Sequence, residues 1–310
     1  MAVWSLEKIH RKEDIDDAVS KLKEKADDFT SYERKTKDGL DEDDFIEALE
    51  KKEEILKMIS KLSAYAGLWH SENTSDPERN AFESKISEIC SELMNKMLFF
   101  DIWFKELDDE EAEKYITKTQ EQKKENGYIF YLRSLRKLKP YTLKENEEKI
   151  INIKDLTGNY EITKVFDILT NKLTFDWEGK KIGQEELVQN VKSHEREKRV
   201  EAYNTLLSRY EEEGPVIGEI YRSIALDWKN ENINLRGFNT PISVRNMAND
   251  LEDEIVDMLL EIVRKKRHVF HEYFNLKSKI LGHGMDRYDI YAPLSEQKKG
   301  FDFERSKKTV

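Results

Sequence analysis

Glycine and proline are scarce in this chain, and their scarcity restricts its possible folds more than any other feature. There are 12 glycines and 5 prolines among 310 residues. All-β and α/β folds need such turn residues at short intervals, whereas long helices do not. Abundant Glu, Lys and Leu, with apolar residues three or four positions apart, favour helices. The sequence therefore predicts an all-α fold, an elongated multi-helix scaffold whose helices pack through apolar stripes.

Helix boundaries can be predicted where capping residues interrupt the apolar pattern. Apolar periodicity indicates helices over residues 12–30 and from residue 43 onward. Asp76 followed by Pro77 is typical of a helix start, because a proline at the first helical position needs no N–H. The most strongly amphipathic stretch covers residues 251–280, and Gly282 is placed to end that helix.

One segment departs from the helical pattern. Residues 173–177 alternate apolar and polar side chains, and Glu178 and Gly179 then provide a turn before Ile182. Alternation across a short turn is the signature of a β-hairpin, so we predict one small hairpin near residues 172–183. Beyond it, the apolar spacing from Gln184 predicts a return to helix that continues through residue 206.

Charge and cysteine content restrict partners and location. The net charge of -11 predicts no nucleic-acid partner and no anionic-membrane partner, because phosphate binding needs a surplus of Lys and Arg. A lone cysteine, Cys90, excludes an internal disulfide and is predicted to be a buried hydrophobe. The first eight residues hold no apolar core of signal-peptide length. We therefore expect a cytoplasmic protein that does not span a membrane.

Two stretches approach the zinc-binding pattern H-E-x-x-H without completing it. That pattern requires two histidines one helical turn apart, with a glutamate between them as general base. In residues 194–198 the second histidine is replaced by Lys198, and in residues 271–275 it is replaced by Asn275. His268 and His271 are three residues apart, but in a helix rich in Lys and Arg such a pair is usually a surface feature. We predict no metal site and no catalytic residue in this chain.

Three stretches resemble the oligoendopeptidase F family, relatives of the thimet oligopeptidases. The first is residues 131–143, a basic run that leads through a proline into the Glu-Glu pair of residues 147–150. The second is residues 236–239. The third is residues 273–282, followed by the Tyr-Asp-x-x-Ala-Pro segment of residues 288–294. These stretches occur in the family's order along nearly the whole chain.

The resemblance implies a fold, an activity and a division of the chain. Residues 1–190 would be the N-terminal helical region, and residues 191–310 the incomplete start of the catalytic helical domain. The complete family member is a cytosolic zinc metalloendopeptidase that hydrolyses short oligopeptides in a deep channel. Its H-E-x-x-H helix lies downstream of the Tyr-Asp-x-x-Ala-Pro segment. We therefore expect a fragment that is inactive alone, carries no zinc and depends on a missing C-terminal catalytic part.

The same resemblance suggests where substrate would pass. This helical half would form one wall of the channel, and we expect Arg236, Phe238 and Asn239 to lie near the groove. The alternative, that these three residues only shape a turn, stays open. We also expect the face of residues 251–262 that bears Leu251 and Ile255 to lack its normal cover.

Two other functions are compatible with the sequence. The chain could be a helical interaction protein that has the fold and has lost the catalysis. It could also be one half of a split peptidase, with the H-E-x-x-H helix on a separate polypeptide.

Overall fold

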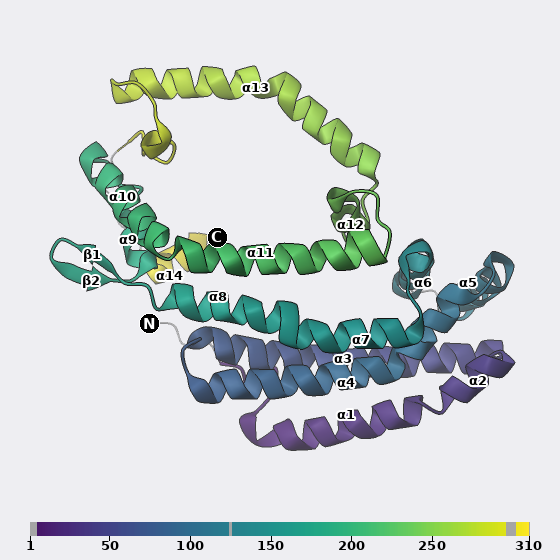
Figure 1. Ribbon diagram of the computed structural model, residues 1–310. Coiled ribbons are helices and arrows are strands. Elements are labelled where there is room, and N and C mark those ends of the chain that lie inside the picture. The colour runs from purple at the N-terminus through teal and green to yellow at the C-terminus, as the bar shows by residue number, and fades with distance from the viewer. Residues whose placement is uncertain (1–4, 124–125, 296–301, 310) are drawn as a thin grey trace. The chain divides into compact units, whose positions relative to one another are not determined.

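The chain is almost entirely helical, as predicted. The computed structural model describes residues 5–123, 126–295 and 302–309 (Figure 1). Within these ranges the strands are β1 (Phe175–Trp177) and β2 (Lys180–Ile182), which pair antiparallel with Phe175 opposite Ile182. The prediction of an all-α fold with one small hairpin near residues 172–183 is confirmed.

The helices belong to two compact units. The first unit contains residues 1–171 and 220–250, and the second contains residues 172–219 and 251–310. Each is described by itself below. The predicted division into domains 1–190 and 191–310 stays a prediction.

The first unit is built on two long helices, α3 (Glu42–Glu72) and α4 (Pro77–Glu106), which pack along each other and against α1 (Ile15–Phe29) (Figure 1). Asp76 caps α4, because its carboxylate accepts the backbone N–H groups of Glu78 and Arg79. Pro77 is the first helical residue, as predicted. The core between these helices is aromatic, with Phe45 stacked between the rings of Phe100 and Phe104. Cys90 is buried in the same core, as predicted.

Further helices surround this core. They are α2 (Tyr32–Asp38), α5 (Asp109–Lys123), α6 (Asn126–Leu138), α7 (Glu145–Asp155) and α8 (Glu161–Asn171). A single π-helical turn, η3 (Leu156–Tyr160), joins α7 to α8, and α7 runs along α4 (Figure 1). The chain later returns to this unit through the end of α11 (Gly214–Lys229), the π-helical turn η4 (Asn230–Leu235) and α12 (Pro241–Ala248).

A buried polar joint connects three helices of the first unit. The Lys52 ammonium on α3 forms an ion pair with Asp101 on α4 and donates a hydrogen bond to the Tyr131 hydroxyl on α6 at 2.8 Å. Tyr131 in turn donates to Asp101 at 2.6 Å. Burial lowers the pKa of Lys52 and raises that of Tyr131 well above its usual value, the latter with a further contribution from Asp101. The joint therefore satisfies a lysine whose side chain is 5% exposed.

The second unit has a smaller core. Helices α9 (Gln184–Asn190) and α10 (Arg196–Glu212) pack on the hairpin. Glu178 and Gly179 both have positive φ, 48° and 77°, as a tight hairpin turn requires. The core residues are Leu173, Phe175, Trp177, Ile182, Leu187, Val191, Ala202 and Tyr203.

The prediction of one continuous helix from Gln184 to residue 206 is wrong. The first helix ends at Asn190 and the second begins at Arg196. Arg199 explains the break, because its guanidinium donates to the carbonyl oxygens of Ser193 and His194, both at 2.9 Å. In a continuous helix these carbonyl groups would accept backbone N–H groups, but here they accept from a side chain of the following helix, α10.

The longest helix of the second unit is α13 (Asp253–Leu281), which ends at Gly282 in the left-handed conformation, as predicted. A short helix, α14 (Phe303–Thr309), follows later in the chain. Residues 1–4, which belong to the segment analysed for a signal peptide, and residues 296–301 lie outside the described residues. None of the described helices combines the length and apolar character needed to cross a membrane.

The buried joint predicts a specific mutational effect. Replacing Asp101 by Ala leaves the Lys52 ammonium buried without its counter-charge, which should lower the free energy of unfolding by about 3–5 kcal/mol. Urea denaturation followed by circular dichroism measures this loss. Lys21→Ala is the control, since the Lys21–Asp17 pair is exposed, 64% and 67%. Equal midpoints for the two variants would contradict the prediction.

Candidate functional site

The loop that follows η4 carries the three residues predicted to lie near a substrate groove. Gly237 adopts a left-handed conformation, with φ at 79°, and so turns the chain sharply between Arg236 and Phe238. Thr240 then caps α12 by accepting the backbone N–H of Ser243 at 3.2 Å. The loop is thus fixed between two helical ends.

Arg236 is held by two carboxylates. Its Nη1 and Nη2 donate to the two oxygens of Glu148, at 2.7 and 2.9 Å, and its Nε donates to Glu231 at 2.8 Å. The side chains of Arg236 and Glu148 are 16% and 10% exposed. This two-pronged pair holds the pKa of Glu148 below its usual value against the opposing effect of burial. The pair joins α7 to the loop across 88 residues of sequence.

Phe238 and Asn239 have different environments. Phe238 is buried, and its ring lies parallel to that of Tyr141, with centroids 3.7 Å apart and an interplanar angle of 9°. Asn239 is exposed. The Tyr141–Phe238 stack connects two of the segments that carry the family resemblance, residues 131–143 and residues 236–239.

Arg236 and Phe238 line a pocket of about 470 Å³ within the first unit. Its volume is in the range that small-molecule sites occupy. Asn239 is not among the residues that line it. The walls come from α4, α6, the segment before α7, α7 itself, η4 and α12. The lining also includes Leu98, Ile102, Lys105, Phe130, Ser134, Lys137, Leu138, Thr142, Glu148, Asn232, Val244, Met247 and Asp250.

The carboxyl group of Asp155, close to the charge of Arg236, has a raised pKa. Burial, reinforced by the nearby carboxylates Glu231 and Asp227, raises the pKa of Asp155 to about 6, and Arg236 only partly opposes this. Asp155 ends α7 at the π-helical turn η3, and Glu231 lies on the other π-helical turn, η4. Two irregular turns therefore bring like charges together at one place.

The described residues do not provide a zinc site. No group of three or more His, Cys, Asp and Glu in the described ranges is arranged to hold a metal ion. His194 lies in the turn before α10 instead of on a helix, and its carbonyl oxygen is bound by Arg199. His268 and His271 lie on exposed positions of α13. The set of donors that zinc prefers is not brought together here.

The Tyr-Asp-x-x-Ala-Pro segment is anchored by a residue that the sequence analysis missed. Asp289 and Arg199 are 0% and 1% exposed, and Arg199 Nη2 donates to Asp289 Oδ1 at 2.6 Å. Arg199 Nε also donates to the carbonyl oxygen of Tyr288. This pairing holds the pKa of Asp289 below its usual value despite burial. Because Arg199 lies in a run of charged residues, nothing in the sequence distinguished it from a solvated side chain.

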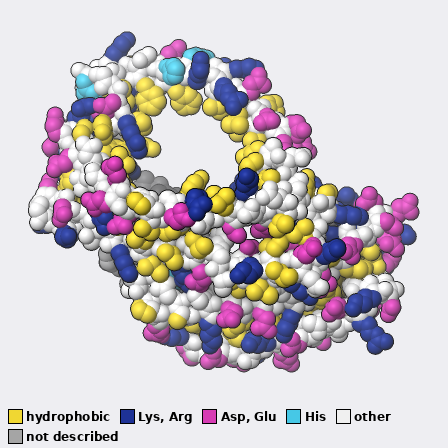
Figure 2. All heavy atoms as spheres, in the orientation of Figure 1, with side chains coloured by type: hydrophobic (Ala, Val, Ile, Leu, Met, Phe, Trp, Pro, Cys, Tyr) yellow, Lys and Arg dark blue, Asp and Glu magenta, His cyan; other side chains and the backbone are white. Residues whose placement is uncertain are grey.

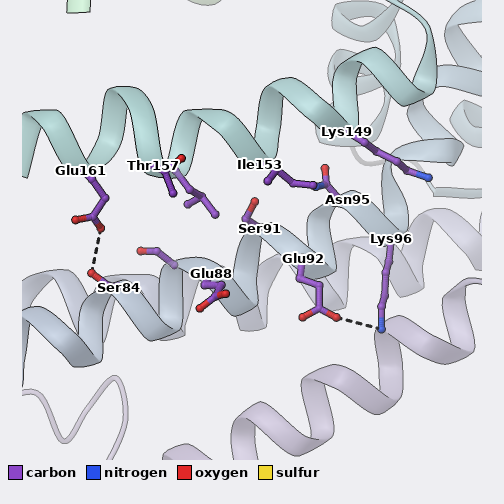
Figure 3. Close-up of a pocket in the computed structure, with 12 residues that line it drawn as sticks. Ser84, Glu88, Ser91, Glu92, Asn95, Lys96, Lys149, Ile153, Thr157 and Glu161 are labelled. Carbon is purple, nitrogen blue, oxygen red and sulfur yellow. Dashed lines mark hydrogen bonds and ion pairs between the residues drawn. The ribbon is translucent and has the colours of Figure 1, made fainter.

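A second hollow lies along α4. It has a volume of about 820 Å³, and Figure 3 shows α4 on one side of it and the α7–η3–α8 run on the other. Ser84, Ser91 and Asn95 line it from α4, and Ile153 and Thr157 line it from the facing helix. Hydrogen bonds cross the hollow at both ends, from Ser84 to Glu161 at 3.0 Å and from Asn152 to Asn95 at 2.7 Å. These hydrogen bonds link α4 to the facing run through polar side chains.

The fold is similar to that of a solved oligoendopeptidase. The crystal structure of oligoendopeptidase-F from Enterococcus faecium matches with a TM-score of 0.76 at 19% sequence identity. The match covers 93% of this chain and 57% of that one.

The sequence comparisons find similarity to oligopeptidases. Residues 103–175 match the family model described as Oligopeptidase F. Group B oligopeptidase PepB of Streptococcus agalactiae is 22% identical over 277 residues, which is 85% of this chain and 44% of that protein. The oligoendopeptidase F homolog of Borreliella burgdorferi is 24% identical over 297 residues, or 93% of this chain and 47% of that protein. The chain is similar to the N-terminal region of oligoendopeptidase F proteins, and it spans about half the length of these curated relatives.

The raised pKa of Asp155 predicts a pH dependence of stability. Below the unfolded pKa of about 3.9 the carboxyl group is mostly protonated in both the folded and the unfolded state, so it contributes little to the free energy of unfolding. As the pH rises from about 4 to about 6, the unfolded state releases this proton while the folded state retains it, so stability is lost across this range and the loss is complete above about pH 6. Asp155→Asn should therefore raise the free energy of unfolding at pH 7.5 by about 1 kcal/mol after allowance for solvent screening, with no gain at pH 3.5.

Thermal unfolding of both proteins at the two pH values tests this. The gain at pH 7.5 corresponds to a rise in Tm of about 2 °C. A gain of the same size at pH 3.5 would show that the effect does not come from the charge of Asp155.

Proposed function

We propose that this chain forms the N-terminal wall of the substrate channel of a zinc oligopeptidase that hydrolyses short peptides. In this proposal the chain is inactive by itself, and residues of a catalytic part outside these 310 supply the zinc ligands. The similarity to oligoendopeptidases supports the peptidase assignment. The greater length of those relatives supports the need for a further part. The cytoplasmic location predicted from the sequence stays part of this proposal.

The observation that carries the proposal is the uncovered apolar face of α13. Ile255, Leu259 and Ile262 are 47%, 59% and 49% exposed, although they lie on one face of the helix. Figure 2 shows hydrophobic side chains along one edge of this helix, and basic side chains and histidines along the other. The stripe continues through Val269 and Tyr273, 50% and 49% exposed.

A stripe of this length is not explained by the described chain alone. Isolated exposed apolar residues are common, but a contiguous row along one helix marks an interaction surface. Over the 29 residues of α13, the buried residue is Lys277, near the C-terminal end. A helical partner that packs along the row would bury it by ordinary ridge-into-groove contacts. We assign that role to the catalytic part of the peptidase.

The loop residues predicted near the groove receive uneven support. The side chains of Arg236 and Phe238 are engaged in internal contacts, so their part in the proposal is to fix the loop. Asn239 is exposed and is the residue free to meet a peptide. Its contact with substrate is proposed on that exposure and on its position beside the pocket.

Peptide cleavage tests the proposed division of labour. The 310-residue chain, supplied with zinc, should not cleave a quenched fluorescent peptide. Addition of the C-terminal half of the Borreliella burgdorferi homolog as a separate polypeptide should produce cleavage that a zinc chelator abolishes. Chelator-sensitive cleavage by the 310-residue chain alone would contradict the proposal.

The uncovered face gives a second prediction. Replacing Leu259 and Ile262 together by Gln should reduce the fluorescence of the dye ANS bound to the chain by roughly half or more, because a large apolar patch is removed. The helical signal in circular dichroism should not change. The control is Arg264→Gln, which lies on the opposite face of the helix by its spacing. Equal fluorescence for the three proteins would show that this face is not an open apolar surface.

A further inference from the structure

Lys105 is a partly buried lysine without a partner. Burial lowers its pKa, as it does for Lys52 and Lys277. Those two lysines are compensated, since Lys52 pairs with Asp101 and Lys277 donates to the carbonyl oxygen of Ile290 at 2.7 Å. Lys105 Nζ has neither a hydrogen bond nor an ion pair within the described part of the chain.

The carboxylates around Lys105 are already occupied. Asp101 and Glu148 both act on the Lys105 charge from a distance. Asp101 is bound by Lys52 and Tyr131. Glu148 accepts from Arg236 and from the backbone N–H of Leu143. A lysine that is partly desolvated without a directly paired counter-charge is unfavourable, so an anion that binds beside Lys105 would stabilise its charge.

Lys105 lines the 470 Å³ pocket described above, and the other charges of that pocket cancel. Arg236 pairs with Glu148, and Lys137 pairs with Asp250 at 2.5 Å. The pocket lining is therefore left with one excess positive charge.

The other residues that line the pocket indicate the chemical character of the rest of the ligand. Leu98, Ile102, Leu138, Val244 and Met247 provide apolar surface, and Phe130 adds an aromatic ring that is 56% exposed. Ser134 contributes a hydroxyl group that has no hydrogen-bond partner within the described residues and is suited to a hydrogen bond with a ligand oxygen. Such walls disfavour a fully hydrated inorganic anion, because its remaining oxygens would lose their water. They suit a single negative group attached to an apolar body.

We propose that this pocket binds a small organic carboxylate with an apolar side chain, and that Lys105 forms the ion pair with its carboxylate. The proposal concerns binding by the 310-residue chain and does not depend on the peptidase function. Two sources share this chemistry, a free acid and the C-terminus of a short peptide.

The experiment compares carboxylates with their uncharged amides. N-acetyl-leucine and N-acetyl-Gly-Gly-Leu are titrated into the 310-residue chain by calorimetry, each beside its C-terminal amide. Each acid that binds should bind about tenfold more tightly than its amide, since the amide cannot form the charge-assisted hydrogen bond. Tighter binding of the peptide identifies a peptide C-terminus as the source, and tighter binding of N-acetyl-leucine identifies a free acid. Equal affinity of acids and amides, or no binding of either acid, overturns the proposal.

Variants of the lysine test its role. Lys105→Met should weaken binding of the acid about tenfold and leave that of the amide unchanged, because only the charged contact is lost. Lys105→Arg should keep the preference for the acid. Lys181→Met is the matched control, since Lys181 is exposed on β2. The Tm of unliganded Lys105→Met should equal or exceed that of the unmutated chain, as removal of an unpaired buried charge implies. Unchanged acid binding by Lys105→Met overturns the proposal, and the acid–amide comparison decides if that variant does not fold.

Discussion

Buried charges fix sequence-distant segments in both units of this protein. An ionised group that leaves water must find a partner, or the fold loses several kcal/mol. The chain meets this requirement by pairing groups far apart in sequence, such as Lys52 with Asp101 and Arg236 with Glu148. Arg199 and Asp289 make the corresponding pair in the second unit. Apolar stripes bring the helices together with little positional selectivity, whereas each ion pair fixes one register between two segments.

Two features of the described chain have no partner within it. Lys105 lacks a counter-charge, and the apolar face of α13 lacks a cover. A natural sequence keeps a locally unfavourable feature where function needs it. We therefore assign a ligand to the first and a protein partner to the second.

The sequence predicted the elements whose signals are local. Asp76, Pro77 and Gly282 act at helix ends through their own backbone and side-chain chemistry, and Glu178 and Gly179 shape the hairpin turn in the same way. The break between α9 and α10 was missed, because its cause is Arg199, whose partner Asp289 lies 90 residues away. Lys105 was missed because the segments that surround it, such as those of Phe130 and Val244, lie far away in the sequence. In a chain in which 38% of the residues are charged, composition does not show which charges are buried.

The contacts of α13 within the chain indicate what a partner that covers its apolar face must provide. Near its C-terminal end, Lys277 binds the carbonyl oxygen of Ile290 and Ser278 donates to that of His283 at 2.6 Å. These bonds fix that end to the segment containing Asp289, which Arg199 anchors in turn. From Asp253 to Leu276 the helix has no buried residue. A long helix gains most of its stability from packing of its apolar face, and tethering one end does not replace that packing. A cover that stabilises α13 therefore has to extend along its length, as a helix or a helical domain would.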